Sequence, residues 1–138
     1  MNWTVEKYRE HFGQNGNPKG RPAKNETPLE KMQALGRLPG GEMNKTEKHY
    51  QEFLSAQKHA GTVLWFSFEP INIRLGKGCF YRADFLVMLK SGALEVHEVK
   101  GHWTDDALVK FKVAAALLPM RFKAVRMKGG AFETILEI

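Results

Sequence analysis

Two acidic residues and one lysine lie on neighbouring segments that both have the composition of β-strands. Asp84 interrupts an otherwise apolar run, and Glu98 stands two positions before Lys100 in the next run. The Lys-Ser-Gly sequence at 90–92 fits a three-residue hairpin loop with its glycine in the left-handed conformation, which places Asp84 opposite Glu98. Two carboxylates and an amine at one end of a hairpin are the groups that a divalent metal site for phosphodiester hydrolysis needs.

The hairpin also predicts which side chains share a face with these groups. Because strand side chains alternate between the two faces of a sheet, Glu98 and Lys100 point to the same side. His97 points to the opposite side, which argues against a role as a metal ligand. The apolar residues expected on the face of Glu98 are Leu86, Met88, Leu94 and Val96. Charged groups on such an apolar face are costly to bury without a function or a counter-ion.

A third acidic residue is predicted on a preceding helix. Glu47, Tyr50 and Leu54 follow helical spacing, so Glu47 lies in line with the core-facing stripe. Glu52 lies about 140° further round the helix, because each residue turns it by about 100°. Glu47 is therefore the better candidate for a further ligand. A Glu-x-Lys sequence alone usually marks a solvent face with a weak ion pair, and it is the position of Asp84 and Glu47 that favours a catalytic site.

The elements that must position these residues are a helix, three strands, a second helix and two closing strands. Thr104 is a helix cap, Asp105 and Asp106 suit a first helical turn, and Pro119 ends the second helix. The order predicts an α/β sandwich of one sheet and two main helices. The expected segments are helix 45–60, strands 62–68, 80–89 and 93–101, helix 104–118, and strands 121–127 and 131–138.

Residues 1–44 differ from the domain predicted at 45–138 and have the pattern of two short helices joined by a basic linker. The linker contains Lys-Gly-Arg-Pro at 19–22, which resembles the Gly-Arg-Pro core of hooks that enter the DNA minor groove. Lys19 and Arg21 are therefore candidate DNA contacts, and a solvated basic linker is the alternative.

Composition narrows the class of partner and of compartment. The formal net charge is +6, and residues 45–138 hold 14 lysines and arginines against 10 acids. This balance favours a polyanionic partner, although charge alone does not separate nucleic acid from an acidic protein or a membrane surface. The single Cys79 excludes an intrachain disulfide framework and favours a reducing cytoplasm. No apolar run approaches membrane-spanning length, and the N-terminus lacks a signal-peptide pattern.

Taken together, the motifs resemble the PD-(D/E)xK nuclease superfamily. Tyr-Arg-Ala-Asp-Phe-Leu at 81–86 precedes Glu-Val-Lys-Gly-His-Trp at 98–103. Within the superfamily, residues 44–128 most resemble the small phage endonuclease I type of Holliday-junction resolvase and related phage proteins. One departure is Ala83, where that group has a proline that shapes the backbone rather than the chemistry.

The resemblance implies a restriction-endonuclease-like core with a short helical N-terminal arm. It implies that Asp84 and Glu98 bind Mg²⁺, or Mn²⁺ in its place, that Glu47 assists, and that Lys100 orients or activates the attacking water. It also implies cleavage that leaves a 5′-phosphate, and a homodimer that places two sites on one DNA junction. A phage or prophage origin, with action in the cytoplasm of the bacterial host, belongs to the same expectation.

Further DNA contacts are expected around the second helix. Lys110 and Lys112 flank its apolar stripe, and His102 lies at the rim of the hairpin. Each is a candidate contact to phosphate or substrate, and each has a solvated surface residue as its alternative. Trp103 is expected to be a packing anchor rather than a stacking platform.

The expected function is metal-dependent hydrolysis of branched DNA during phage recombination or replication. One alternative is a nicking or restriction-like nuclease on linear duplex. Another is a catalytically silent DNA-binding factor with the same fold, although the intact Asp-Glu-Lys set argues against it. A small RNA-binding protein is the third, and the lack of clustered exposed aromatics on a sheet makes it less attractive.

Overall fold

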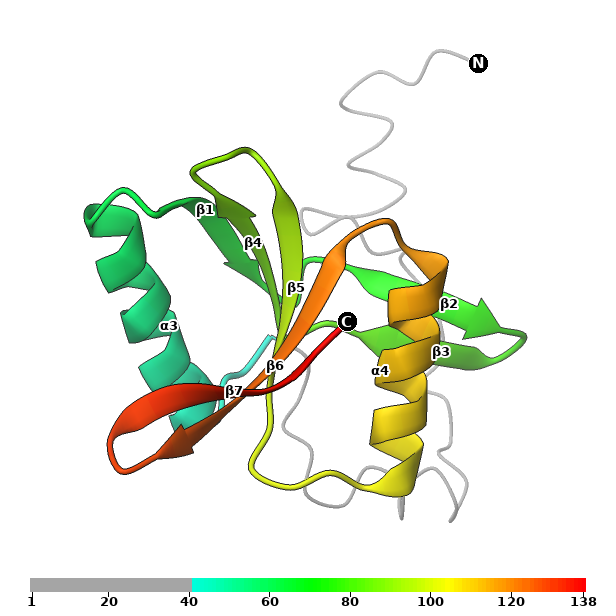
Figure 1. Cartoon of the computed structure of the whole chain (residues 1–138). Coiled ribbons are helices and arrows are strands. Elements are labelled where there is room, and N and C mark those ends of the chain that lie inside the picture. Colours follow the sequence, from blue (N-terminus) through cyan, green and yellow to red (C-terminus); the bar gives the residue numbers. More distant parts are fainter. Residues whose placement is uncertain (1–40) are drawn as a thin grey trace, which may run out of the picture. The chain divides into compact units, whose positions relative to one another are not determined.

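The computed structural model describes residues 41–138, which lie in the second of the two units into which the chain divides, Leu38–Ile138. The predictions for residues 1–40, including Lys19 and Arg21, lie outside the described residues. The elements, labelled as in Figure 1, are α3 (Lys45–His59), β1 (Val63–Phe68), β2 (Asn72–Gly76), β3 (Cys79–Arg82), β4 (Phe85–Leu89), β5 (Leu94–Val99), α4 (Asp105–Leu117), β6 (Arg121–Lys128) and β7 (Ala131–Glu137).

A mixed five-stranded sheet forms the centre of this unit. Its strand order is β1-β4-β5-β6-β7, and β5 and β6 are parallel while the other neighbours are antiparallel. The chain reaches β6 from β5 through α4, as a parallel pair requires. Strands β2 and β3 form a separate two-stranded sheet. Figure 1 shows α3 and α4 on opposite sides of the large sheet.

Each helix covers its own apolar cluster. The cluster under α3 has Tyr50 and Leu54 of that helix packed on Phe85, Val87 and Val99 of the sheet. Because side chains alternate along β5, Val96 and Glu98 point to the face opposite Val99, where α4 packs. The residues of that second cluster are Tyr81, Ala83, Val96, Phe111, Ala114, Phe122 and Ala124.

Local sequence explains where both helices begin. The Asn44 side chain accepts a hydrogen bond from the Glu47 backbone N–H (2.9 Å), and the Glu47 carboxylate accepts one from the Asn44 N–H (2.8 Å). This reciprocal pair is a capping box at the first turn of α3. Thr104 caps α4 through the Ala107 backbone N–H at 3.3 Å.

The predicted α/β architecture, with one large sheet and two main helices, is confirmed. The predicted hairpin turn is confirmed as well, with Gly92 in the left-handed region at φ 84° and its N–H bonded to the Leu89 carbonyl at 2.8 Å. Leu86 pairs with Val96, and Met88 pairs with Leu94. These four residues therefore share one face of the hairpin, as predicted.

One predicted strand was wrong. The segment 80–89 is divided between β3 and β4, which belong to different sheets, and β2 was not predicted. The chain leaves β3 at Ala83, which is completely buried, and the Asp84 carbonyl then accepts a hydrogen bond from the Glu69 N–H at 2.8 Å. This hydrogen bond joins the residue after β1 to the residue before β4, so the chain leaves and re-enters the large sheet at one place. The apolar run 80–89 is therefore divided between the β2–β3 sheet and the large sheet.

Candidate active site

Asp84 and Glu98 lie at the ends of the paired strands β4 and β5. The ladder pairs Phe85 with His97, so the next step along both strands places Asp84 opposite Glu98. Asp84 Oδ2 accepts a hydrogen bond from the Val99 backbone N–H at 2.8 Å. The structure thus brings together the two carboxylates that the hairpin register predicted to be neighbours.

Glu98 is buried and both of its carboxylate oxygens have partners. Lys100 Nζ lies 2.8 Å from Oε1, and the Tyr81 hydroxyl donates a hydrogen bond to Oε2 at 2.5 Å. Glu98 is only 4% exposed, so these two contacts replace the water that a free carboxylate would bind. The arrangement fixes the orientation of the carboxylate beside Asp84.

The Lys100 side chain is positioned by contacts from two elements. Its backbone N–H donates to the Val125 carbonyl of β6 at 2.9 Å, which fixes the chain just after β5. Its Nζ lies 5.8 Å from the ring centroid of Trp103, close enough for a cation–π interaction. Trp103 in turn packs edge-to-face on Phe111 of α4, with centroids 5.3 Å apart. Trp103 is therefore the packing anchor that was predicted.

Glu47 lies at the first turn of α3 and is half-buried, whereas Glu52 is exposed. Partial burial raises the pKa of Glu47, and the nearby negative charges of Glu69 and Glu98 add to this rise. Glu47 and Glu98 are therefore close enough to repel each other. Glu47 lies on the part of α3 nearest these charges, and its carboxylate forms part of the α3 capping box.

The pKa of Asp84 depends on its burial and on the charges around it. Burial raises the pKa of Asp84 well above its ordinary value, and the adjacent negative charge of Glu98 raises it further. The hydrogen bond from Val99 and the positive charge of Lys100 act in the opposite direction, while Glu47 adds to the rise. Three acids with one lysine leave an excess of negative charge that a cation would neutralise.

The donor set fits Mg²⁺ in chemical type. Mg²⁺ takes oxygen ligands and keeps several waters, so two carboxylates together with a substrate phosphate are sufficient. Asp84 and Glu98 would supply those carboxylates. Among residues 41–138 no group of three or more His, Cys, Asp and Glu side chains has metal-binding geometry. The capping box, which holds the Glu47 carboxylate, is one reason that a third ligand is missing.

The residues that were predicted to contact DNA around the second helix all lie at the surface, and they differ in exposure and in ion pairing. His102 and Lys112 are exposed. Lys110 forms an ion pair with Asp106 one turn earlier, at 3.1 Å. Such an exposed helical pair contributes little stability and leaves the lysine accessible.

Tyr81 is a site residue that the sequence interpretation missed. Placing Tyr81 on the same strand as Asp84 gave its hydroxyl no particular partner. The break at Ala83 instead puts Tyr81 on β3, from which it reaches Glu98. A buried tyrosine normally finds a hydrogen-bond partner for its hydroxyl, and this was the signal available in the sequence.

A series of buried side-chain hydrogen bonds on the α3 side of the sheet was also missed in the sequence analysis. The Tyr50 hydroxyl lies 2.8 Å from His97 Nδ1, and His97 Nε2 lies 2.8 Å from Glu95 Oε2. Lys123 Nζ lies 3.4 Å from the same Glu95 oxygen. Because Glu95 accepts from Nε2–H, Nδ1 is left to accept from the tyrosine. His97 faces away from Glu98, as predicted, and its hydrogen bond with Tyr50 connects β5 with α3.

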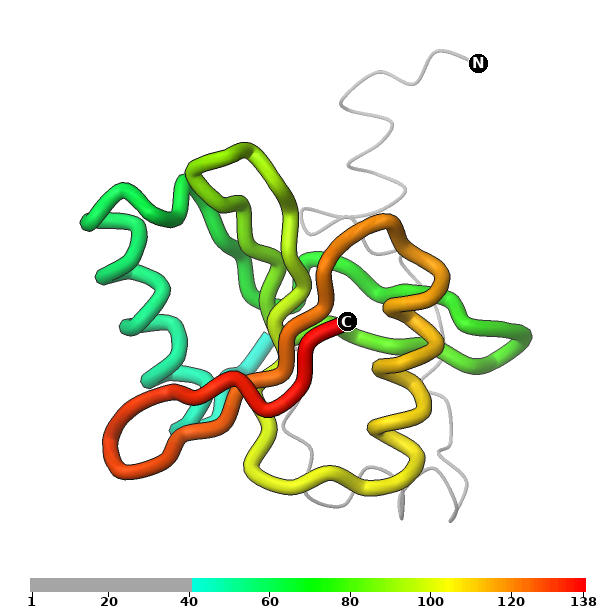
Figure 2. Tube along the Cα trace, viewed as in Figure 1, coloured from blue at the N-terminus to red at the C-terminus, as the bar shows by residue number. Residues whose placement is uncertain are grey.

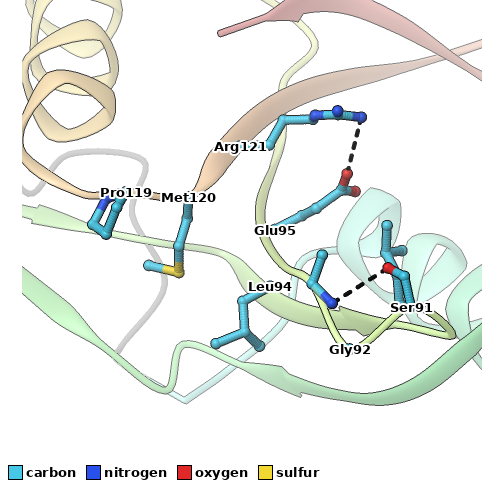
Figure 3. Close-up of a pocket in the computed structure, with 9 residues that line it drawn as sticks. Ser91, Gly92, Leu94, Glu95, Pro119, Met120 and Arg121 are labelled. Atoms are coloured by element: carbon cyan, nitrogen blue, oxygen red, sulfur yellow. Dashed lines mark hydrogen bonds and ion pairs between the residues drawn. The ribbon is translucent and has the colours of Figure 1, made fainter.

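A groove of about 810 Å³ lies at the start of β5, whereas Glu98 lies at the end of this strand. Arg121 approaches Glu95 there, with Nη1 3.5 Å from Oε1 (Figure 3). Its other labelled lining residues are Ser91, Gly92, Leu94, Pro119 and Met120. The groove is thus separate from the cluster of Asp84, Glu98 and Lys100.

Comparison of the chain with family models, with curated proteins and with solved structures finds no match to any of them. Within residues 41–138, neither helix is long and apolar enough to cross a membrane.

Proposed function

We propose that this protein is a metal-dependent DNA endonuclease whose active site consists of Asp84, Glu98 and Lys100, assisted by Glu47. One observation carries the proposal. The buried carboxylate of Glu98 and the partly buried carboxylate of Asp84 lie side by side at the ends of paired strands, with the amine of Lys100 2.8 Å from that of Glu98. Adjacent carboxylates that are largely removed from water raise the free energy of the folded chain, and a bound cation would offset this cost.

Each residue has a task that its position supports. Asp84 and Glu98 would hold Mg²⁺, or Mn²⁺ in its place, and Glu47 would join them directly or through water. Bound Mg²⁺ would polarise the phosphoryl oxygen and lower the pKa of an attacking water. The ammonium group of Lys100 would stabilise the negative charge that develops on the phosphate. The contact with Trp103 holds that ammonium group in place.

The topology supports assigning the unit to the restriction-endonuclease-like fold. A helix is followed by the antiparallel neighbours β1, β4 and β5, then by α4 and the parallel strand β6. This order is the one expected from the resemblance to PD-(D/E)xK nucleases. The acids lie where the antiparallel part of the sheet meets the crossover to the parallel strand.

The substrate, the assembly and the setting are proposed from the same resemblance. We propose branched DNA, such as a four-way junction, as the substrate, and a homodimer as the cutting form. Action in a bacterial cytoplasm on DNA of phage or prophage origin completes the proposal. The excess of basic over acidic residues supports a phosphodiester partner.

The proposal is tested by incubating the full chain with Mg²⁺ and a labelled four-way junction, next to a linear duplex of matched sequence. Glu98→Gln should abolish cutting, because it removes a metal-binding charge and the partner of Lys100. Glu52→Gln is the matched control, since Glu52 is exposed on α3. Symmetric cuts near the crossover support junction resolution. Equal cutting of both substrates keeps the chemistry but favours the nicking or restriction-like alternative.

The partners that Glu98 and Glu47 have within the protein favour a second candidate, a catalytically silent DNA-binding factor. Both oxygens of Glu98 have partners within the protein, and the Glu47 carboxylate caps its own helix. Titration with Mg²⁺ and Mn²⁺, followed by calorimetry, separates the two candidates. Heat that disappears in Asp84→Asn supports the enzyme. Tight DNA binding with no metal response, and no cutting, would move the assignment to the silent factor.

A further inference from the structure

The β2–β3 hairpin projects from the large sheet next to α4 (Figure 2). Its ladder pairs Asn72 with Arg82, Ile73 with Tyr81, and Arg74 with Phe80. Because strand side chains alternate, the hairpin has an inner face with Ile73 and Tyr81 and an outer face with Arg74, Phe80 and Arg82. The pattern of exposure agrees, since Tyr81 is buried while the three outer residues are exposed.

The inner face attaches the hairpin to the candidate active site. Tyr81 donates its hydrogen bond to Glu98 and packs edge-to-face on Phe111 of α4, with ring centroids 6.2 Å apart. Ile73 packs against the same apolar cluster. The inner face therefore holds the hairpin against the element that carries Glu98, and the outer face is left open to solvent.

The outer face is strongly basic. The segment 70–83 contains Arg74, Lys77 and Arg82 and no aspartate or glutamate. Arg82 is 53% exposed, and its only acidic neighbour among the described residues within ion-pair range is Glu69, at 3.7 Å. A run of positive charge on a two-stranded ribbon attracts a polyanion.

An aromatic ring stands within this basic face. Phe80 is 47% exposed. Arg74 is its cross-strand partner, and Arg82 follows two positions later on the same face. An exposed phenyl ring is common when it stands alone. A phenyl ring beside two arginines is also a combination that suits a nucleic acid strand, because a base can stack on the ring while the phosphates contact the cations.

The combination discriminates between polyanions. An acidic peptide would use the arginines but would gain nothing from a flat ring. A continuous duplex would use the arginines but keeps its bases stacked inside. A strand with unpaired bases uses both, and such strands occur where DNA branches or opens.

We propose that the outer face of the β2–β3 hairpin binds DNA with unpaired bases, with phosphates on Arg74, Lys77 and Arg82 and a base on Phe80. This inference rests on the proposed function, because it takes DNA as the substrate. It adds the element that holds the substrate and a preference for open over continuous duplex.

The test measures binding in EDTA by fluorescence anisotropy, with a labelled splayed fork and the matched blunt duplex. Arg74→Gln with Lys77→Gln removes two charges, and Lys58→Gln with Lys90→Gln removes two exposed charges elsewhere. The hairpin pair should weaken fork binding about tenfold and lower the salt slope by about 1 to 2, whereas the control pair should change binding less than about threefold. Phe80→Ala should weaken fork binding about tenfold and duplex binding little.

The outcomes separate this inference from the proposed function. Equal losses in the hairpin and control pairs overturn the inference, because they indicate a general charge effect. A Phe80→Ala variant that binds fork and duplex like the unmodified chain overturns it as well. If those variants bind normally and the unmodified chain cuts DNA in Mg²⁺, the nuclease stands without the hairpin surface. If hairpin effects appear but no cutting occurs, the surface stands and the nuclease does not.

Discussion

At the scale of single residues, the candidate site depends on how Glu98 is held. Its two carboxylate oxygens are bonded to different elements, Lys100 just after β5 and Tyr81 on β3. Partners that orient a metal ligand commonly change metal affinity or activity by about 10- to 100-fold when they are removed. Tyr81 is thus as informative a target as the acids themselves.

Tyr81→Phe removes the donor to Glu98 and leaves the packing of the ring intact. We expect a loss of about 1–2 kcal/mol in the free energy of unfolding, because a buried carboxylate oxygen loses its partner. We also expect a fall of about tenfold in metal affinity or cutting rate. Denaturant unfolding and metal titration measure the two effects. Phe80→Ala, one position away and exposed, is the stability control. Unchanged stability and metal affinity in Tyr81→Phe would contradict the assigned role.

Asp84→Asn should stabilise the protein at pH 7 in the absence of divalent ions. The raised pKa of Asp84 means that its ionised form is disfavoured in the folded state. An amide keeps an oxygen to accept from Val99 and removes the repulsion with Glu98. A gain of about 1 kcal/mol is expected from thermal unfolding in EDTA. Mg²⁺ should stabilise the unmodified protein and not the variant. A destabilised variant would show that Asp84 is chiefly a structural acceptor.

At the scale of elements, α3 and β5 are joined by the chain of Tyr50, His97 and Glu95. Tyr50 lies one turn after Glu47, and His97 lies one residue before Glu98. The hydrogen bond between Tyr50 and His97 therefore fixes the position along β5 at which α3 presents Glu47. This hydrogen bond lies on the α3 side of the sheet, opposite to the side that carries Glu98.

Tyr50→Phe should cost about 1–2 kcal/mol in the free energy of unfolding, since His97 Nδ1 loses its buried donor. If the proposed function holds, cutting should also weaken, because Glu47 is less well placed. Denaturant unfolding and the junction assay measure both. Phe53→Leu, at a half-exposed ring that stacks on Tyr50, controls for altered packing. Equal stability of Tyr50→Phe and the unmodified chain would contradict this account.

His97 should make stability depend on pH. Burial lowers the pKa of His97, and the hydrogen bond to Glu95 offsets only part of this effect. Its contribution is therefore present above the unfolded value near 6.5 and is lost as pH falls towards the lower folded value. The charged groups facing it are Glu95, Lys123 and Glu137. When the pH falls from 7.5 to 5.5, the free energy of unfolding should decrease less in His97→Gln than in the unmodified chain. Denaturant unfolding should show a difference of about 1 kcal/mol between the two decreases. Parallel pH profiles would contradict the prediction.

The sequence predicted the large elements because their signals are local. Helical spacing, the capping residues of α3 and α4, and the Gly92 turn each act within a few positions. The pairing of Asp84 with Glu98 followed from that turn. The β2–β3 hairpin was missed because one uninterrupted apolar run hid the change of sheet at Ala83. The partners of Tyr81 and His97 are 17 and 47 residues away along the chain, and no local pattern encodes contacts at such separations.

At the scale of the whole molecule, the proposed cutting of junctions requires two active sites acting together. We expect sedimentation equilibrium to show a dimer at micromolar concentration, and each dimer to bind one junction. On a junction in a supercoiled plasmid, the dimer should cut the first strand and then the second strand before it dissociates from the DNA. A monomer at every concentration, or single independent nicks, would contradict paired cutting while leaving the chemistry of one site intact.

The hydrogen bond from Tyr81 to Glu98 joins two sites into one thermodynamic cycle. In the proposed function, Glu98 would hold the cation and the hairpin carrying Tyr81 would hold the DNA strand. Whatever a bound cation does to the affinity for DNA, bound DNA must do to the affinity for the cation by the same factor, because binding free energies are reciprocal. Tyr81→Phe should therefore reduce that factor towards one. Where that factor exceeds one, the protein would hold its cation most firmly after branched DNA has bound, and DNA-free molecules would be the less active ones.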